Sequence, residues 1–179
     1  LRSLMPRLPD SACAVLTVDL AALVENWRLL AARTGPAECA SVVKANAYGI
    51  GITEVAPALA ASGCGTFFVA TAEEGAELRG ILGPEPNIFA FNGPMEATAA
   101  DLLSHNVVPV LNDLGQIETW AETARTARSR LVAALHVDTG MNRLGLPPEE
   151  VAVLGAEPKR LEGIEVALVS LPRCLALVR

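Results

Sequence analysis

Lysine and aromatic residues are scarce in this chain. Only two of its 179 residues are lysines, Lys44 and Lys159, and only one is a tyrosine, Tyr48. The chain has 14 basic and 20 acidic residues, a net charge of −6, and no cluster of Lys and Arg. Because nucleic-acid binding needs a basic face that neutralises phosphates, we expect no nucleic-acid partner.

Long uncharged apolar runs are also missing. No segment approaches the ~18 residues needed to cross a bilayer, and the opening LRSLMPRLPDSACAVL lacks the continuous apolar stretch of a secretion signal. We therefore expect no membrane partner and a cytoplasmic location. Apolar residues nevertheless make up 51% of the chain, which is enough for a buried core and argues against intrinsic disorder.

The four cysteines are too widely spaced for a zinc site or a compact disulfide framework. They are Cys13, Cys39, Cys64 and Cys174. We expect each to be a small buried hydrophobic residue in a reducing compartment, and we expect no metal.

Short apolar runs alternate with amphipathic stretches, which predicts alternating strands and helices. A first strand is predicted at 14–20, followed by a helix that Asp19 caps. Thr71 and Glu74 predict a capping box, and Asn112 is predicted to cap the helix after the fifth strand. The strands predicted after the first lie at 41–44, 66–71, 87–91, 107–111, 131–138 and 164–171.

Continuous apolar strands joined by helices indicate a parallel sheet covered by helices. Two architectures satisfy this pattern, an open doubly wound sheet and a (β/α)8 barrel. No G-x-G-x-x-G follows a strand, which weakens the dinucleotide-binding form of the open sheet. Polar motifs recur just past the predicted strand ends: KANAYG, FNG and DTGMNRLG. Chemistry at strand ends suits the carboxyl face of a barrel, and it also suits an open sheet.

Lys44 ends an apolar strand in SVVKANAYGIG. Burial there disfavours its charged form, and a neutral amine can attack a carbonyl. The alternative is a lysine whose charged group simply reaches water. Tyr48 follows, with Gly49 and Gly51 beside it, and its phenol can donate to a phosphate oxygen. The alternative is that Tyr48 packs into a turn.

Arg143 and Asp138 lie in HVDTGMNRLG, directly after the strand predicted at 131–138. The planar guanidinium suits a carboxylate or a phenolate oxygen. Asp138 can pair with Arg143 or hold the loop, and a purely structural pair is the alternative to a binding site. We expect His136 to be a hydrogen-bonded core residue and His105 to lie at the surface.

Together, VVKANAYG and HVDTGMNRLG, about 90 residues apart, closely resemble the alanine racemase family, in which the first segment is the lysine signature for pyridoxal 5′-phosphate (PLP). TVDLAALVENWRLL, GCGTFFVATAEEGAELR and VPVLND are similar to the same family in the same order. The resemblance implies an α/β fold with a (β/α)8 TIM-type barrel that binds PLP at its mouth. It divides the chain into a lead (1–13), a partial barrel (14–169) and a tail (170–179).

The resemblance also implies roles for three residues. Lys44 matches the catalytic lysine that holds PLP covalently and moves the proton on the D-alanine side. Tyr48 matches a tyrosine that contacts the cofactor phosphate. Arg143 matches an arginine near the phenolic oxygen of the cofactor and the substrate carboxylate. The implied activity is PLP-dependent interconversion of L-alanine and D-alanine, which supplies D-alanine for peptidoglycan, in a homodimer.

Three features depart from the family pattern. Ile50 stands where many members have a histidine, and His136 stands where some have a lysine. The last ten residues, SLPRCLALVR, replace the usual continuation. About six βα units leave the barrel incomplete, and the C-terminal β-domain, with the tyrosine that acts on the opposite face, is absent. We therefore expect a truncated or frameshifted racemase with impaired activity. The alternative is a non-catalytic PLP-binding remnant or a fragment of a racemase gene.

Overall fold

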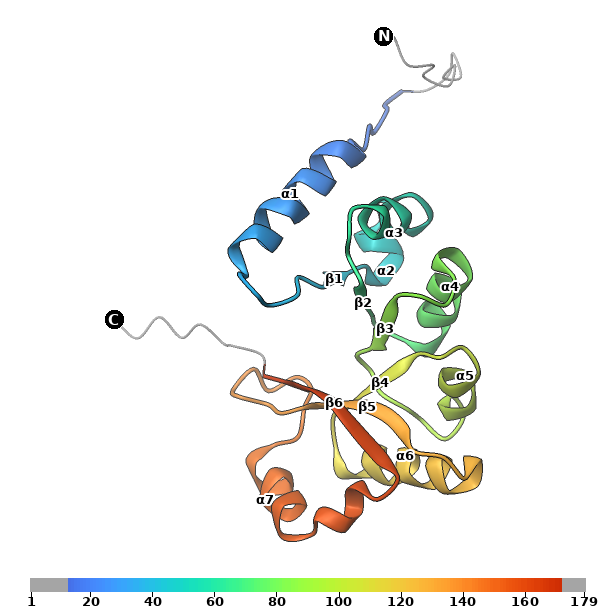
Figure 1. Ribbon diagram of the computed structural model, residues 1–179, viewed down its shortest axis with the longest axis vertical. Helices are drawn as coiled ribbons and strands as arrows, with labels where there is room; N and C mark the ends of the chain where they lie inside the picture. The colour runs from blue at the N-terminus through green and yellow to red at the C-terminus, as the bar shows by residue number, and fades with distance from the viewer. Residues whose placement is uncertain (1–12, 172–179) are drawn as a thin grey trace, which may run out of the picture.

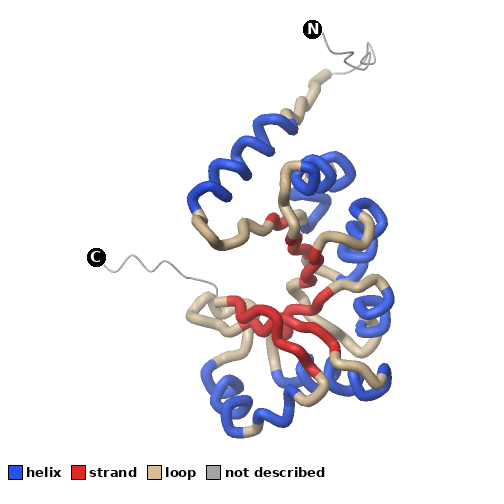
Figure 2. Tube along the Cα trace, viewed as in Figure 1, coloured by secondary structure: helices blue, strands red, loops and turns tan. Residues whose placement is uncertain are grey.

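The computed structural model describes residues 13–171 and contains one parallel sheet of six strands (Figures 1 and 2). Neighbours in sequence are neighbours in the sheet, in the order β1-β2-β3-β4-β5-β6. An open doubly wound sheet reverses its strand order at a switch point, whereas a barrel does not. The fold is therefore the (β/α)-barrel type, with six of its strands present. These are β1 (Ser41–Val42), β2 (Thr66–Val69), β3 (Asn87–Ala90), β4 (Val108–Leu111), β5 (Leu131–His136) and β6 (Ile164–Ser170).

Helices connect the strands and cover the outer face of the sheet (Figure 1). Their apolar side chains pack on this face in one large core that includes Phe67, Ile88, Leu102 and Trp120. The helical segments are α1 (Leu20–Arg33), α2 (Lys44–Tyr48), α3 (Ile52–Ala61), α4 (Ala72–Leu82), α5 (Ala99–Ser104), α6 (Leu114–Ala127), α7 (Pro148–Ala156) and the 3-10 turn η1 (Pro158–Leu161).

A smaller apolar cluster occupies the inner face of the sheet. Successive strand residues point to opposite faces, so Phe68 and its register partner Phe89 point away from the helices. The rings of Phe89 and Phe91 each lie 5.0 Å from the ring of Phe68, centroid to centroid, in stacked geometry. Val108, Val110 and Ala134 complete the cluster. Three stacked rings therefore lie at the carboxyl ends of β2 and β3.

The inner face is open at its margins. Val42 on β1 and Leu168 on β6 are 41% and 37% exposed, although both are apolar and lie in strands. Val132 on β5 is exposed to a similar degree, 40%. The interior side chains are therefore covered best at the middle strands.

The strand predicted at 14–20 is wrong. Residues 14–19 are irregular and exposed, and no strand among residues 13–171 pairs with them. Alternating apolar residues satisfy the strand period, but a strand also needs a hydrogen-bonded neighbour. The predicted cap is confirmed, because the Asp19 carboxylate accepts the Ala22 N–H at 3.0 Å and α1 begins at Leu20.

The prediction that Asn112 caps a helix is also wrong. Asp113 caps α6 instead, and its carboxylate accepts the Gln116 N–H at 2.8 Å. Asn112 is buried, and its carboxamide donates to the carbonyls of Phe91 and Val110. Asn and Asp are both good N-cap residues. Which of Asn112 and Asp113 becomes the cap depends on where the chain turns after β4, and this cannot be read from residue type.

The termini and cysteines meet the predictions only in part. The predicted lead (1–13) and tail (170–179) lie mostly outside the described residues, as does Cys174. Cys64 is buried as expected, Cys39 is intermediate and Cys13 is exposed, so the burial expected for Cys13 is wrong. Cys13 precedes the first helix and therefore lies outside the packed core.

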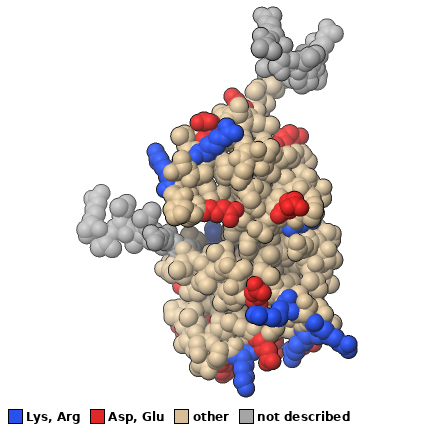
Figure 3. All heavy atoms as spheres, in the orientation of Figure 1, with Lys and Arg blue, Asp and Glu red and all other residues tan. Residues whose placement is uncertain are grey.

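The charged residues are dispersed. On the face drawn in Figure 3, acidic and basic side chains are interspersed and form no continuous basic surface. Within residues 13–171, no helix has both the length and the apolarity needed to span a bilayer.

Candidate active site

Lys44 lies just beyond the carboxyl end of β1. The ladder ends at Val43, whose N–H donates to the Phe68 carbonyl at 2.9 Å, and Lys44 is half-buried. Its Nζ lies 5.9 Å from the centroid of the Phe91 ring. No ion pair among residues 13–171 involves this amine. The strand therefore ends earlier than the sequence predicts, and the amine stands over the aromatic cluster without a carboxylate partner.

The residues after Lys44 form a left-handed turn. Ala45, Asn46, Ala47 and Tyr48 have φ values between 52° and 56°, a region that costs non-glycine residues about 1–2 kcal/mol each. Gly49, with a φ of 84°, ends the turn at little steric cost. Consecutive strained residues persist only where their surroundings hold them, and strain of this kind clusters at functional sites.

Three anchors hold this turn. The Asn46 Oδ1 accepts the N–H of Ile52, the first residue of α3, at 2.7 Å. Ala47 is buried in the core. The Glu74 Oε1 accepts the Ala45 N–H at 2.8 Å. The turn is therefore tied to both α3 and α4.

Glu74 does more than the predicted capping box requires. The Thr71 hydroxyl accepts the Glu74 N–H at 3.3 Å, which confirms one half of the box. The Glu74 carboxylate does not return to Thr71 but accepts the N–H groups of Ala45 and Ala70. Sequence analysis missed this role because the spacing from Thr71 already explained the glutamate.

Tyr48 and Ile50 face solvent. Tyr48 is 65% exposed, so it does not pack into the turn, and its phenol is available to a ligand at this edge of the sheet. Ile50, which stands where related sequences were expected to have a histidine, is 38% exposed. Tyr48 and Ile50 therefore present their side chains outward, whereas Ala47, which precedes them, is buried.

Asp138 shapes the loop that carries Arg143. Its carboxylate accepts the backbone N–H groups of Gly140 at 2.9 Å, Met141 at 2.8 Å and Asn142 at 3.0 Å. These bonds, the one from Gly140 foremost, hold the pKa of Asp138 below its usual value. Arg143 is exposed and makes no ion pair with Asp138 in the described part of the chain. Of the two predicted roles for Asp138, the structure shows loop holding.

His136 is the core histidine that the sequence predicts. It is 9% exposed, and its Nδ1 lies 2.8 Å from the Asn112 Oδ1. The Asn112 Nδ2 donates to the carbonyls of Phe91 at 2.8 Å and Val110 at 2.9 Å, so the Oδ1 accepts and Nδ1 carries the proton. Burial lowers the pKa of His136. His105, by contrast, is exposed, as predicted.

The predicted site residues share one edge of the sheet. Lys44 and Tyr48 follow β1, and Arg143 follows β5, so all three lie beyond the carboxyl ends of parallel strands. Three strands, β2 to β4, separate the two groups in the sheet. No hydrogen bond or ion pair among residues 13–171 joins Lys44 to Arg143. A ligand that contacts both Lys44 and Arg143 would have to extend across the carboxyl ends of β2 to β4.

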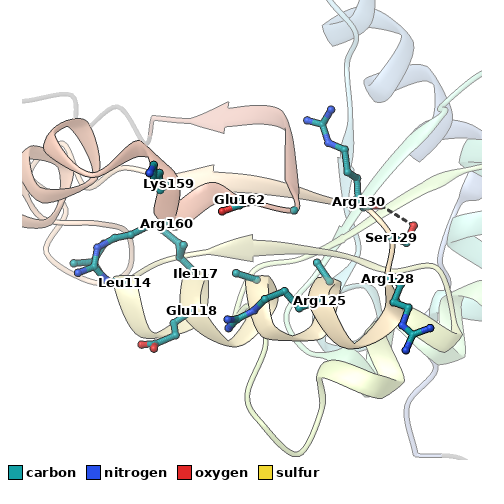
Figure 4. A pocket seen from close by; sticks show the side chains of 13 residues that line it. Leu114, Ile117, Glu118, Arg125, Arg128, Ser129, Arg130, Lys159, Arg160 and Glu162 are labelled. Atoms are coloured by element: carbon teal, nitrogen blue, oxygen red, sulfur yellow. Dashed lines mark hydrogen bonds between the residues drawn. The ribbon is translucent and has the colours of Figure 1, made fainter.

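A cavity of about 570 Å³ lies elsewhere, between α6 and the segments 128–130 and 159–163 (Figure 4). None of the predicted site residues lines it. Arg128 and Arg130 point in opposite directions in the close-up, and Arg125 and Arg160 form ion pairs with Glu122 and Glu157. Its charged groups therefore do not converge on one point.

The fold and the strand-end residues define a (β/α)-barrel domain with a lysine at its carboxyl edge. The family described as "alanine racemase, N-terminal domain" matches residues 18–171. The chain belongs to the alanine racemase family.

Curated relatives support this assignment. An alanine racemase of Rhodospirillum rubrum is 46% identical over 161 residues, and the match covers 89% of this chain and 43% of the relative. One of Methylobacterium nodulans is 50% identical over 149 residues, covering 80% of this chain and 40% of the relative. The chain therefore spans less than half the length of these relatives.

Solved structures agree on the fold. The alanine racemase of Bartonella henselae, described with covalently bound pyridoxal phosphate, superposes with a TM-score of 0.84 at 36% identity, covering 88% of this chain and 46% of that chain. The histidine racemase of Leuconostoc mesenteroides gives a TM-score of 0.71 at 25% identity, covering 81% of this chain and 39% of that chain.

Proposed function

We propose that this chain is the lysine-bearing, cofactor-binding part of a PLP-dependent alanine racemase, with residues 14–169 as its partial barrel. One observation carries the proposal: Lys44 is half-buried, and its amine stands at the carboxyl edge of a barrel sheet with no carboxylate partner in the described part. A structural lysine at such a place would be expected to pair with a carboxylate. An amine kept for covalent chemistry does not need such a partner.

The residues at this edge fit PLP. Lys44 offers an amine for the aldehyde, and Tyr48 offers an exposed phenol that can donate to a phosphate oxygen. Arg143 offers a guanidinium that suits the phenolic oxygen or a substrate carboxylate. When bound, PLP supplies an electron sink for the carbanion that remains after an amino acid loses its α-proton.

Lys44 has two tasks in this proposal. Its amine would hold PLP through the cofactor aldehyde. The same amine would take or return the α-proton of the amino acid on one face.

Racemisation also needs a proton-transfer group on the opposite face. Tyr48 is the only tyrosine of the chain, and we assign it to the phosphate. We therefore propose that the 179-residue chain alone binds PLP and turns over alanine slowly or not at all. The homodimer that the family resemblance implies is part of the same proposal. The second candidate function is PLP binding without catalysis, which the same missing group favours.

The test is a PLP titration of the purified 179-residue chain. We expect a visible absorbance band that Lys44→Ala abolishes and that Lys159→Ala, which changes the only other lysine, leaves unchanged. Borohydride reduction and peptide mapping should place the cofactor on Lys44. Failure of the unmodified chain to form the adduct would contradict the proposal.

Turnover separates the two candidate functions. Chiral chromatography after incubation with L-alanine measures racemisation, and histidine serves as a second substrate because of the likeness to a histidine racemase. Covalent PLP without turnover supports the binding function. Rapid turnover by the isolated chain would show that a second proton-transfer group is present. Size-exclusion chromatography with light scattering reports the oligomeric state.

A further inference from the structure

We infer that Glu74 is a positioning residue for Lys44, because its carboxylate joins the N–H of Ala45 to the N–H of Ala70. This inference rests on the proposed function of Lys44. The carboxylate uses one oxygen for each donor, at 2.8 Å for Ala45 and 2.7 Å for Ala70. Hydrogen bonds to an ionised acceptor are stronger than those between neutral groups.

The two donors belong to different parts of the site. Ala45 is the residue after Lys44 and the first of the left-handed turn. Ala70 follows β2, and its carbonyl accepts the Asn92 N–H at 2.9 Å, so it is fixed to the segment after β3. Glu74 thus ties the strained turn to the segments that follow β2 and β3.

The main chain of Lys44 is anchored on both sides. Val43 is bonded to β2 through the Phe68 carbonyl, and Ala45 is bonded to α4 through Glu74. With both neighbours fixed, only the side-chain torsions of Lys44 remain to place its amine. In this arrangement, Nζ lies 5.9 Å from the centroid of the Phe91 ring. Loss of the Ala45 anchor would free one side of the lysine.

Other glutamates of α4 do not share this role. Glu73 and Glu77 are exposed, and neither bonds to the turn within residues 13–171. Glu74 is held in place by the cap of its own helix, since its N–H donates to the Thr71 hydroxyl. The helix therefore presents one carboxylate to the turn, and Glu77 offers a matched control on the same helix.

The first experiment measures covalent PLP binding by the full chain and by Glu74→Ala, Glu74→Gln and Glu77→Gln. Glu74→Ala removes both acceptors and should weaken adduct formation by about tenfold or more, as expected for loss of a hydrogen bond to a charged group. Glu74→Gln keeps one acceptor and should lie between Glu74→Ala and the unmodified chain. Glu77→Gln should match the unmodified chain.

The second experiment needs no cofactor. Amide hydrogen exchange followed by mass spectrometry should show peptides spanning 44–51 exchanging about tenfold faster in Glu74→Ala, with core strands unchanged. A merely structural role predicts something else: exchange would rise throughout the chain, and PLP would bind with unchanged affinity at a temperature where the variant stays folded. That result would overturn the inference.

The two proposals can fail separately. If the unmodified chain forms no adduct, the proposed function fails and Glu74 has no amine reaction to support. If the unmodified chain forms the adduct and Glu74→Ala forms it equally well, only the inference about Glu74 fails.

Discussion

The carboxamide of Asn112 bonds to the imidazole of His136 at 2.8 Å and at the same time to two strand-end carbonyls. Asn112 is 5% exposed, and its amide nitrogen reaches Phe91 after β3 and Val110 in β4. One side chain therefore links β3, β4 and β5 where their carboxyl ends approach the candidate site.

Asn112→Ala should lower the free energy of unfolding by about 2–4 kcal/mol. The change removes the hydrogen bonds that Asn112 makes to the carbonyls of Phe91 and Val110 and to the buried imidazole of His136, and lost bonds at buried polar groups are costly. Urea denaturation followed by circular dichroism measures the effect. Asn87→Ala, at the exposed first residue of β3, should stay within about 0.5 kcal/mol of the unmodified chain. Equal effects of the two variants would contradict this account.

His136 should make stability depend on pH on the acid side of neutrality. Burial lowers the pKa of His136 below 6.5, so the unfolded chain binds this proton more readily than the folded chain does. Neutral His136 therefore contributes to the free energy of unfolding above pH 6.5, and this contribution is lost as the pH falls through the lowered pKa of the folded state. Urea midpoints measured between about pH 7.5 and 5.5 should fall, and His136→Gln should flatten the fall. His105→Gln, at an exposed histidine, should leave the slope unchanged.

Much of the fold could be predicted from the sequence because its signals are local. Apolar runs gave the six paired strands, and the caps at Asp19 and Thr71 are as predicted. The choice between barrel and open sheet could not be made from those runs, since it depends on strand order. The resemblance carried by the segments around Lys44 and Arg143 made that choice, and the sheet order confirms it.

The details of the site could not be predicted in the same way. The left-handed turn has no signature in Ala-Asn-Ala-Tyr, in which only asparagine tolerates that region well. The anchor on Ala45 comes from Glu74, which is 29 residues away along the chain. Such contacts arise from the packing of α4 beside the turn, and no local pattern encodes them. The strand predicted at 14–20 failed for a related reason, because pairing is also non-local.

Asp138→Ala should loosen the loop that carries Arg143 without unfolding the domain. The carboxylate is the shared acceptor of the N–H groups of Gly140, Met141 and Asn142, and the loop lies at the surface. Amide exchange in a peptide spanning 138–146 should accelerate, while the urea midpoint changes little. Asp101→Ala, at an exposed aspartate of α5, should leave this peptide unaffected. A large loss of global stability in Asp138→Ala would show that the loop is part of the cooperative core.

The left-handed turn predicts different effects on stability for the same substitution at two exposed alanines. Ala45 has a φ of 52°, whereas Ala152 lies in the interior of α7. Glycine relieves the left-handed cost of about 1–2 kcal/mol at position 45 but adds about 0.4–1 kcal/mol of unfolded-state entropy. Ala45→Gly should therefore leave the free energy of unfolding unchanged or raise it by up to about 1.6 kcal/mol.

Replacing Ala152 in α7 with glycine relieves no backbone strain, because this residue lies in a regular helix. Ala152→Gly should lower the free energy of unfolding by about 1 kcal/mol, the usual cost of glycine inside a helix. Ala45→Val adds a β-branched side chain where positive φ is least tolerated, so it should destabilise the chain as well. Urea denaturation of the three variants under one set of conditions checks the order. If Ala45→Gly were as destabilising as Ala152→Gly, Ala45 would have an ordinary helical backbone, and the strained turn beside Lys44 would be absent in solution.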